Sequence, residues 1–184
     1  MNQLEASELL RALAFAARKH KDQRRKDAEA SPYINHPIAV ASVLATEAGI
    51  TDATTLLAAV LHDTVEDTET TPEELEREFG PDIAGVVAEV TDDKSLPKEV
   101  RKELQIVHAA EASDRAKAVK IADKTCNVRD VTSAPAKGWS IDRRSKYVDW
   151  ALNVVAGCRG QEPALEAVFD QTVSEARRVL EGGE

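Results

Sequence analysis

The spacing of the apolar residues constrains the fold of this chain more than any other feature of its sequence. They recur at helical intervals along most of the chain, and no segment shows sustained alternation of period two with hairpin turns between. Only 8 Gly and 7 Pro interrupt the 184 residues, and aromatic residues make up 4%. The helix-favouring residues Ala, Glu, Leu, Lys and Arg are abundant. The sequence therefore predicts a compact all-α fold.

Helix start and stop signals divide the chain into segments. Asp52 is an expected N-cap, and Thr71 is another because Pro72 and Glu74 follow it at capping-box positions. Residues 56–61 are apolar on every side, which is typical of a central helix. We see no linker or repeat, so residues 1–184 are predicted to form one domain. The predicted helices cover residues 6–20, 35–49, 52–61, 72–79, 82–90, 97–107, 115–131, 140–157 and 162–180, with a loop over 21–31.

The charge balance excludes several kinds of partner. Lys and Arg number 24 against 33 Asp and Glu, a net charge of −9, which argues against nucleic-acid binding because that requires a dense basic face. No apolar run approaches the ~18 residues of a spanning helix, so no membrane partner and a cytoplasmic location are expected. Cys126 and Cys158 are too few for a disulfide scaffold and are predicted to be reduced thiols.

A charged segment follows the apolar residues 56–61. It holds His62, Asp63, Glu66 and Asp67, and residues four apart share a helix face if the helix continues that far. Acidic groups at the C-terminal end of a helix repel one another and meet the unfavourable end of the helix dipole. A bound divalent cation would remove that conflict, and imidazole and carboxylate are suitable ligands for one.

Two further residues complete a possible metal-ligand set. His36 lies at a predicted helix entry, and Asp123 interrupts an otherwise apolar helix face. Either residue alone is well explained as a hydrogen-bonded His or an ion-paired Asp. Together with His62 and Asp63 they follow a pattern of His, His-Asp and Asp that resembles the HD-domain metal-dependent phosphohydrolases.

Longer motifs resemble one branch of that family, the hydrolase domain of RelA/SpoT-type alarmone enzymes and the small alarmone hydrolases, including metazoan SpoT homologues. The resemblance extends over about residues 14–150, although relatives usually carry a larger apolar or aromatic pair at Thr125 and Cys126. The matching motifs are residues 33–37 (Tyr-Ile-Asn-His-Pro), 61–68 (Leu-His-Asp-Thr-Val-Glu-Asp-Thr), 89–94 (Glu-Val-Thr-Asp-Asp-Lys) and 120–124 (Lys-Ile-Ala-Asp-Lys), with Asn127 and Arg129 after them.

This resemblance implies an HD-domain fold that holds one Mn²⁺ and removes pyrophosphate from the 3′ position of guanosine tetra- or pentaphosphate. The remaining histidines, His20 and His108, are expected at the surface, which favours a single-metal site over a binuclear one. The implied metal ligands are His36, His62, Asp63 and Asp123, and the implied catalytic pair is Glu66 and Asp67, either of which could accept the proton from water.

An anionic nucleotide also needs local positive charge. By resemblance, Arg25, Lys26, Lys98 and Arg143 are expected to contact phosphates. Tyr33 and Tyr147 could stack on the base or sugar, although packing explains them equally well. Asn127 shares the helix face of Asp123 and could bind a ribose hydroxyl or phosphate. Trp139 and Trp150 are assigned to packing.

Three functions remain open from the sequence. The first is the guanosine alarmone 3′-pyrophosphohydrolase. The second keeps the same site but acts on another ribose-phosphorylated nucleotide, an adenosine alarmone or NADPH. The third is a nucleotide-binding regulator without turnover, against which the intact pair Glu66 and Asp67 argues. The chain is expected to degrade alarmone without making it, since its length leaves no room for a synthetase domain, and no obligatory protein partner is evident.

Overall fold

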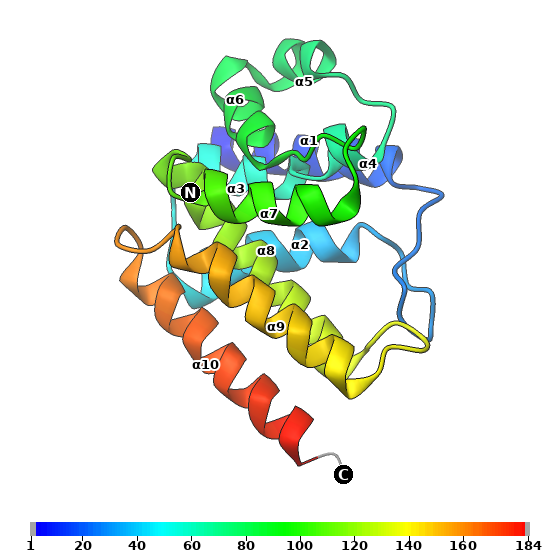
Figure 1. Ribbon diagram of the computed structural model, residues 1–184. Helices are drawn as coiled ribbons and strands as arrows, with labels where there is room; N and C mark the ends of the chain where they lie inside the picture. The colour runs from blue at the N-terminus through cyan, green and yellow to red at the C-terminus, as the bar shows by residue number, and fades with distance from the viewer. Residues whose placement is uncertain (1–2, 183–184) are drawn as a thin grey trace.

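The computed structural model describes residues 3–182 and has a helical architecture (Figure 1). Within this range the only strand-like pairing is an isolated bridge between Arg24 and Pro32, so the all-α prediction is confirmed. Residues 1, 2, 183 and 184 of the predicted domain lie outside the described residues. The elements are α1 (Gln3–Lys19), α2 (Asn35–Ser42), the π-helical turn η1 (Val43–Glu47), α3 (Ala53–Leu61), α4 (Thr64–Asp67), α5 (Pro72–Phe79), α6 (Pro81–Val90), α7 (Lys98–Ala109), α8 (Asp114–Ser133), α9 (Ile141–Ala156) and α10 (Pro163–Glu181).

The predicted helix caps form as expected. Asp52 Oδ2 accepts a hydrogen bond from the Thr55 backbone N–H at 2.9 Å, and Thr71 Oγ1 accepts one from the Glu74 N–H at 3.1 Å. Gly80, with a φ of 88°, separates α5 from α6, a backbone conformation that glycine adopts without strain. The local capping signals thus positioned these helix starts correctly.

Helices α3 and α8 form the centre of the molecule. Residues 55–61 of α3 are all buried, which confirms the prediction of a central helix, and α3 packs against α1, α2, α6 and α8. Helix α8 packs in turn against α2, α3, α6, α9 and α10 (Figure 1). The mutual packing of α2, α3 and α8 brings together three parts of the chain that are far apart in sequence.

Helix α3 ends earlier than one of the sequence arguments required. His62 and Asp63 form a turn, and the chain resumes as the short helix α4. The buried Thr64 Oγ1 donates a hydrogen bond to the Leu61 carbonyl at 2.7 Å, which satisfies a carbonyl at the end of α3. His62 and Asp63 therefore do not share one continuous helix with Glu66 and Asp67. The expected repulsion of these acids by the C-terminal end of the α3 dipole does not apply either. Nevertheless His62, Asp63, Glu66 and Asp67 all line one cavity.

No helix in the described part of the chain combines the length and the apolar composition that a bilayer crossing demands. Cys126 and Cys158 are buried free thiols, as predicted, and burial raises the pKa of Cys126 to about 12.

Candidate active site

The candidate metal ligands converge from three elements. His36 lies in the first turn of α2, His62 follows the end of α3, and Asp123 lies in the middle of α8. Ligand atoms of these three residues lie within 4.8 Å of one another. Asp63 Oδ2 adjoins them, at 3.1 Å from His62 Nε2 and 3.8 Å from His36 Nε2. The packing of α2, α3 and α8 thus assembles the predicted set of two imidazoles and two carboxylates.

The orientation of His62 suits metal coordination. Its Nδ1 lies 2.8 Å from the Ala59 carbonyl oxygen, an arrangement that places a proton on Nδ1 and leaves the lone pair on Nε2. Nε2 is buried and makes no hydrogen bond with the described residues, although it faces the carboxylates. A buried imidazole nitrogen in this position fits a divalent cation, which would supply its missing partner.

Electrostatics in this cluster follow from the close approach of acids and imidazoles. Burial by itself would lower the pKa of His62, but the Asp63 and Asp123 carboxylates raise it to about 9. Burial opposes ionisation of Asp63 and Asp123, yet the nearby cationic groups hold the pKa of both carboxyls below the usual range. The two carboxylates thus favour positive charge between these side chains, and a bound divalent cation would supply it.

Neighbouring side chains hold the carboxylate ligands in place. Lys124 Nζ donates to Asp123 Oδ2 at 2.8 Å, and Asn127 Nδ2 donates to Asp123 Oδ1 at 2.6 Å. The Tyr33 hydroxyl donates to Asp63 Oδ2 at 2.6 Å. Such outer contacts orient metal ligands and tune their affinity. Asn127 and Tyr33, predicted to contact substrate, therefore reach the ligand carboxylates in this structure.

Glu66 and the candidate metal ligands line the same cavity, which has a volume of about 180 Å³. Its Oε2 accepts a hydrogen bond from the Asp92 backbone N–H at 2.9 Å, and its Oε1 lies 3.8 Å from Arg101 Nη1. Burial and the surrounding carboxylates of Asp92, Asp63 and Asp67 raise the pKa of Glu66 to about 7. A carboxyl with a pKa near neutrality is suited to proton transfer.

Asp67 lies between the cavity and a larger cleft. It accepts a hydrogen bond from the Tyr33 hydroxyl at 3.0 Å and forms an ion pair with Lys94, and its backbone carbonyl accepts one from the Gln23 amide. Both Asp63 and Asp67 are thus hydrogen-bonded to the one Tyr33 hydroxyl, and burial with these two carboxylates raises the pKa of that tyrosine far above its usual value. Tyr33 thus holds the candidate metal ligand Asp63 and the candidate catalytic residue Asp67 relative to each other.

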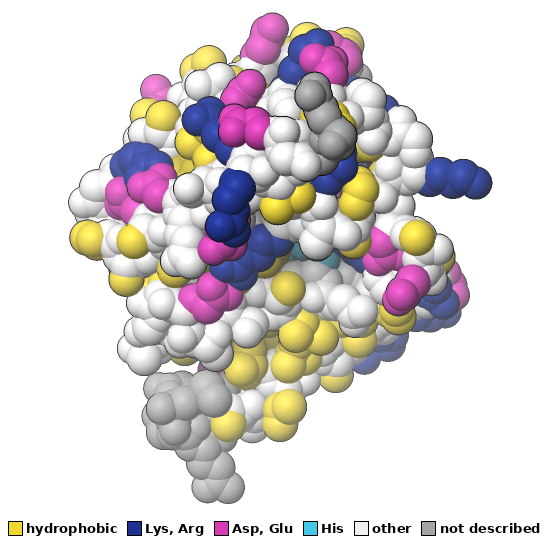
Figure 2. All heavy atoms as spheres, turned by 90° about the horizontal axis from the view of Figure 1, so that it is seen from below, with side chains coloured by type: hydrophobic (Ala, Val, Ile, Leu, Met, Phe, Trp, Pro, Cys, Tyr) yellow, Lys and Arg dark blue, Asp and Glu magenta, His cyan; other side chains and the backbone are white. Residues whose placement is uncertain are grey.

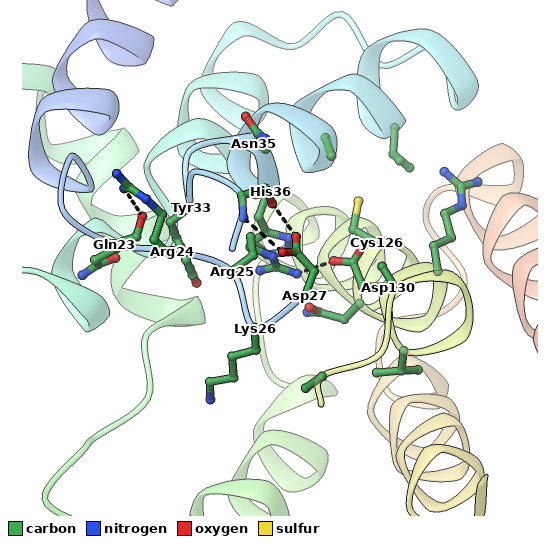
Figure 3. A pocket seen from close by; sticks show the side chains of 18 of the residues that line it. Gln23, Arg24, Arg25, Lys26, Asp27, Tyr33, Asn35, His36, Cys126 and Asp130 are labelled. Carbon is green, nitrogen blue, oxygen red and sulfur yellow. Dashed lines mark hydrogen bonds and ion pairs between the residues drawn. The ribbon is translucent and has the colours of Figure 1, made fainter. Parts of the chain in front are cut away.

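The adjoining cleft measures about 810 Å³ and is lined by residues 23–27 of the loop before α2 together with parts of α2, η1 and α8. Arg25 lies between the ring of Tyr33 and the carboxylate of Asp130, and its guanidinium carbon is 5.6 Å from the centroid of that ring. Lys26 extends away from the other labelled side chains (Figure 3). Figure 2 shows a face of the molecule on which a histidine lies within a hollow beside Lys and Arg side chains. A cleft of this size with basic side chains can accommodate a nucleotide.

The other predicted substrate contacts differ in position. Tyr147 lines the large cleft, whereas Lys98 and Arg143 are exposed and line neither this cleft nor the smaller cavity. The Arg143 guanidinium lies 4.2 Å from the ring centroid of Trp139, which does line the cleft. Trp139 packs against the hydrophobic core, as predicted, and it also forms part of the cleft wall, which was not predicted from the sequence.

His20 corrects a prediction. We expected a surface residue, but His20 is only 2% exposed, whereas His108 is exposed as predicted. The His20 ring stacks on Tyr33 with centroids 4.9 Å apart, and its Nδ1 lies 2.7 Å from Gln23 Oε1. The charged neighbours in residues 18–21 concealed these contacts, because the pattern of a short charged run carries no information about a ring 13 positions away. Neither cavity includes His20 in its wall, so the single-metal interpretation is unchanged.

Comparison with known proteins agrees with this site. The family model described as "HD domain" matches residues 12–152. The chain is 54% identical to the Xenopus tropicalis protein named guanosine-3′,5′-bis(diphosphate) 3′-pyrophosphohydrolase MESH1, over 90% of this chain and 93% of that protein. It is 54% identical to the human protein of the same name, over 91% of this chain and 96% of that protein. A solved structure described as a metazoan orthologue of SpoT that hydrolyses ppGpp superposes with a TM-score of 0.88 and 48% identity, over 91% of this chain and 94% of that one.

Proposed function

The chain belongs to the HD-domain family, and on that premise we propose that it is a metal-dependent guanosine-3′,5′-bis(diphosphate) 3′-pyrophosphohydrolase. Its products are GDP or GTP and pyrophosphate. The main support is that ligand atoms of His36, His62 and Asp123 lie within 4.8 Å of one another, beside a cleft that is large enough for a nucleotide and includes Arg25 and Lys26 in its wall. Relatives that share more than half of their residues with this chain bear the name of the same activity.

The proposed cofactor is one Mn²⁺ per chain. His36, His62, Asp63 and Asp123 would hold it, since their nitrogen and oxygen atoms suit a borderline divalent cation. When bound, such a cation lowers the pKa of a coordinated water and offsets charge on a phosphoryl oxygen. The unpartnered Nε2 of His62 and the low pKa of both carboxyls favour this assignment.

The proposed proton acceptor is one member of the pair Glu66 and Asp67. Glu66 has a pKa of about 7, so it can take a proton from water near neutral pH and give it up again. Asp67 is held by Tyr33 and Lys94, and it can orient that water from the side of the large cleft. Both groups line the same cavity as the candidate metal ligands, which is consistent with these roles.

The proposed substrate contacts surround the same region. Arg25 and Lys26 offer positive charge to the phosphates, and Tyr147 offers a ring for stacking. Arg25 would leave Asp130 when a phosphate takes the place of that carboxylate. Arg143 and Lys98 are proposed as outer contacts that meet phosphate groups extending from the cleft, and Asn127 as a contact to a ribose hydroxyl.

The test is a product analysis with purified protein. Guanosine tetraphosphate and Mn²⁺ are expected to give GDP and pyrophosphate in equal amounts, and a chelator is expected to stop the reaction. An adenosine alarmone and NADPH, assayed in parallel and in competition, identify the preferred nucleotide. Absence of pyrophosphate release from the guanosine substrate at micromolar enzyme would refute the proposal, and a strong preference for NADPH would replace it with the alternative substrate.

A further inference from the structure

Lys120 is a buried cation beside the candidate metal centre. It lies one turn before Asp123 on α8, is 7% exposed, and lines the same cavity as His62 and Glu66. With the described residues Lys120 forms no hydrogen bond and no ion pair. Lys124, one turn further on, is buried to the same degree but donates to Asp123 at 2.8 Å. Lys120 is therefore an ammonium group in a cavity wall without a bonded partner.

The two carboxylates that act electrostatically on Lys120, Asp92 and Asp123, already have other partners. Asp92 Oδ2 accepts a hydrogen bond from Gln105 at 2.6 Å and lies 3.8 Å from Arg101 Nη1. Asp123 is held by Lys124 and Asn127. Burial, together with the Lys124 ammonium, lowers the pKa of Lys120, and Asp92 and Asp123 offset this only in part. None of these groups replaces the hydration that the ammonium loses.

A buried charge without a partner is costly, and an anion that binds beside it would supply the missing pairing. The ligand that matches Lys120 is an anion small enough to share a cavity of about 180 Å³ with the metal ligands and Glu66. A phosphoryl group meets these requirements, and an ammonium binds phosphate as a compact point charge. The position of Lys120 one turn from Asp123 would place that anion next to the metal centre.

We propose that Lys120 is a further catalytic residue, whose ammonium contacts a non-bridging oxygen of the 3′-diphosphate and stabilises the charge that develops on it during hydrolysis. This inference rests on the proposed function. In that reaction the water oxygen bonds to the phosphorus next to the 3′ oxygen, and the bond from that phosphorus to the 3′ oxygen breaks. The electron pair remains on the 3′ oxygen, which receives one proton of the water, while the hydroxyl stays on the pyrophosphate. Positive charge fixed in a dry cavity is effective in such a step because it needs no reorganisation.

The competing explanation is structural: Lys120 would serve only to balance Asp92 and Asp123. The two explanations predict opposite effects of Lys120→Met, which keeps the length of the side chain and removes its charge. If the ammonium balances the acids, the variant loses thermal stability. If it awaits an anion, the variant has an unchanged or higher unfolding midpoint and binds phosphoryl groups weakly.

The experiment compares Lys120→Met with Lys117→Met in the full chain. Lys117 lies on the same helix, is partly exposed and lines neither cavity, so its variant makes the same change of charge away from the site. Three quantities are measured: the unfolding midpoint without metal, the Kd of inorganic pyrophosphate for the Mn²⁺-loaded protein, and kcat on guanosine tetraphosphate. Metal content is determined for each sample.

We expect Lys120→Met to retain metal, to keep or raise the unfolding midpoint, to bind pyrophosphate at least tenfold more weakly and to lower kcat about a hundredfold or more. Lys117→Met should match the wild type in all three. A pyrophosphate Kd within twofold of the wild type, or a lowered midpoint with loss of metal in both Lys120→Met and Lys120→Gln, would overturn the inference. The proposed function can fail separately. If the wild type hydrolyses no guanosine alarmone but its pyrophosphate binding still depends on Lys120, the proposed function is refuted and the anion site at Lys120 stands.

Discussion

Replacing Glu66 by Gln should have opposite effects on stability and on activity. Glu66 is partly buried, with 18% of its side chain exposed, among the carboxylates of Asp63, Asp67 and Asp92. Gln is nearly isosteric, cannot ionise, and retains an oxygen that accepts the Asp92 N–H hydrogen bond. The substitution therefore removes the buried charge without removing the contact.

The structure supplies the size of the effect. The pKa of Glu66 rises from 4.5 to about 7 in the folded protein. A shift of one unit corresponds to about 1.4 kcal/mol, so the ionised carboxylate costs the metal-free protein about 3 kcal/mol above pH 8. Because the folded state binds the proton more tightly, its stability falls as the pH rises from 4.5 to 7. The cost is absent below pH 4.5, where both states are protonated.

The assay is urea unfolding in the presence of a chelator at pH 5 and pH 8. At pH 8 the Glu66→Gln protein should be more stable than the wild type by up to about 3 kcal/mol, and at pH 5 by about 1 kcal/mol or less. With Mn²⁺ the same variant should bind metal normally and lose about 100-fold or more in kcat, the usual contribution of a general base. A variant that is less stable at pH 8, or whose stability difference is the same at both pH values, would refute the reasoning.

Three other substitutions test separate parts of the structure. Asp63→Ala should lose bound metal together with activity, because it removes a carboxylate 3.1 Å from His62 Nε2; metal analysis after dialysis checks this, and full metal occupancy would contradict it. Tyr33→Phe keeps the ring stacked on His20 but removes the hydroxyl that holds Asp63 and Asp67. Mn²⁺ affinity should therefore fall about 10-fold to 100-fold in a metal titration, and unchanged affinity would count against that role. Phe169→Ala should destabilise the protein by about 3–5 kcal/mol in urea unfolding, since Phe169 on α10 is 0% exposed; a loss under 1 kcal/mol would mean that this helix is not part of the core.

The sequence predicted the helices well because their signals are local. The caps at Asp52 and Thr71 formed as expected, and the apolar segment 56–61 became the buried part of α3. The end of that helix was less predictable. The hydrogen bond from Thr64 to the Leu61 carbonyl belongs to a turn that neither periodicity nor composition reveals.

The predicted site residues divide in the same way. Those that belong to a motif with several chemical types, such as His62, Asp63 and Glu66, lie together in one cavity. Residues judged from their neighbours alone were less predictable. The buried His20 looked like a surface residue, and Trp139 has a place in the cleft wall in addition to the predicted packing. Their roles depend on contacts with segments distant in sequence.

The sequence by itself determined that the chain is helical, because side-chain spacing and capping act over one or two turns. It also determined which ligand types are present, and through its motifs the family to which they belong. Only the tertiary structure decided how these groups act on one another. The packing of α2, α3 and α8 sets the distances among His36, His62 and Asp123, and burial with those distances sets the pKa of Glu66 and leaves Lys120 without a partner. Electrostatic interactions depend on separation and on loss of water, and neither quantity is written in the order of the residues.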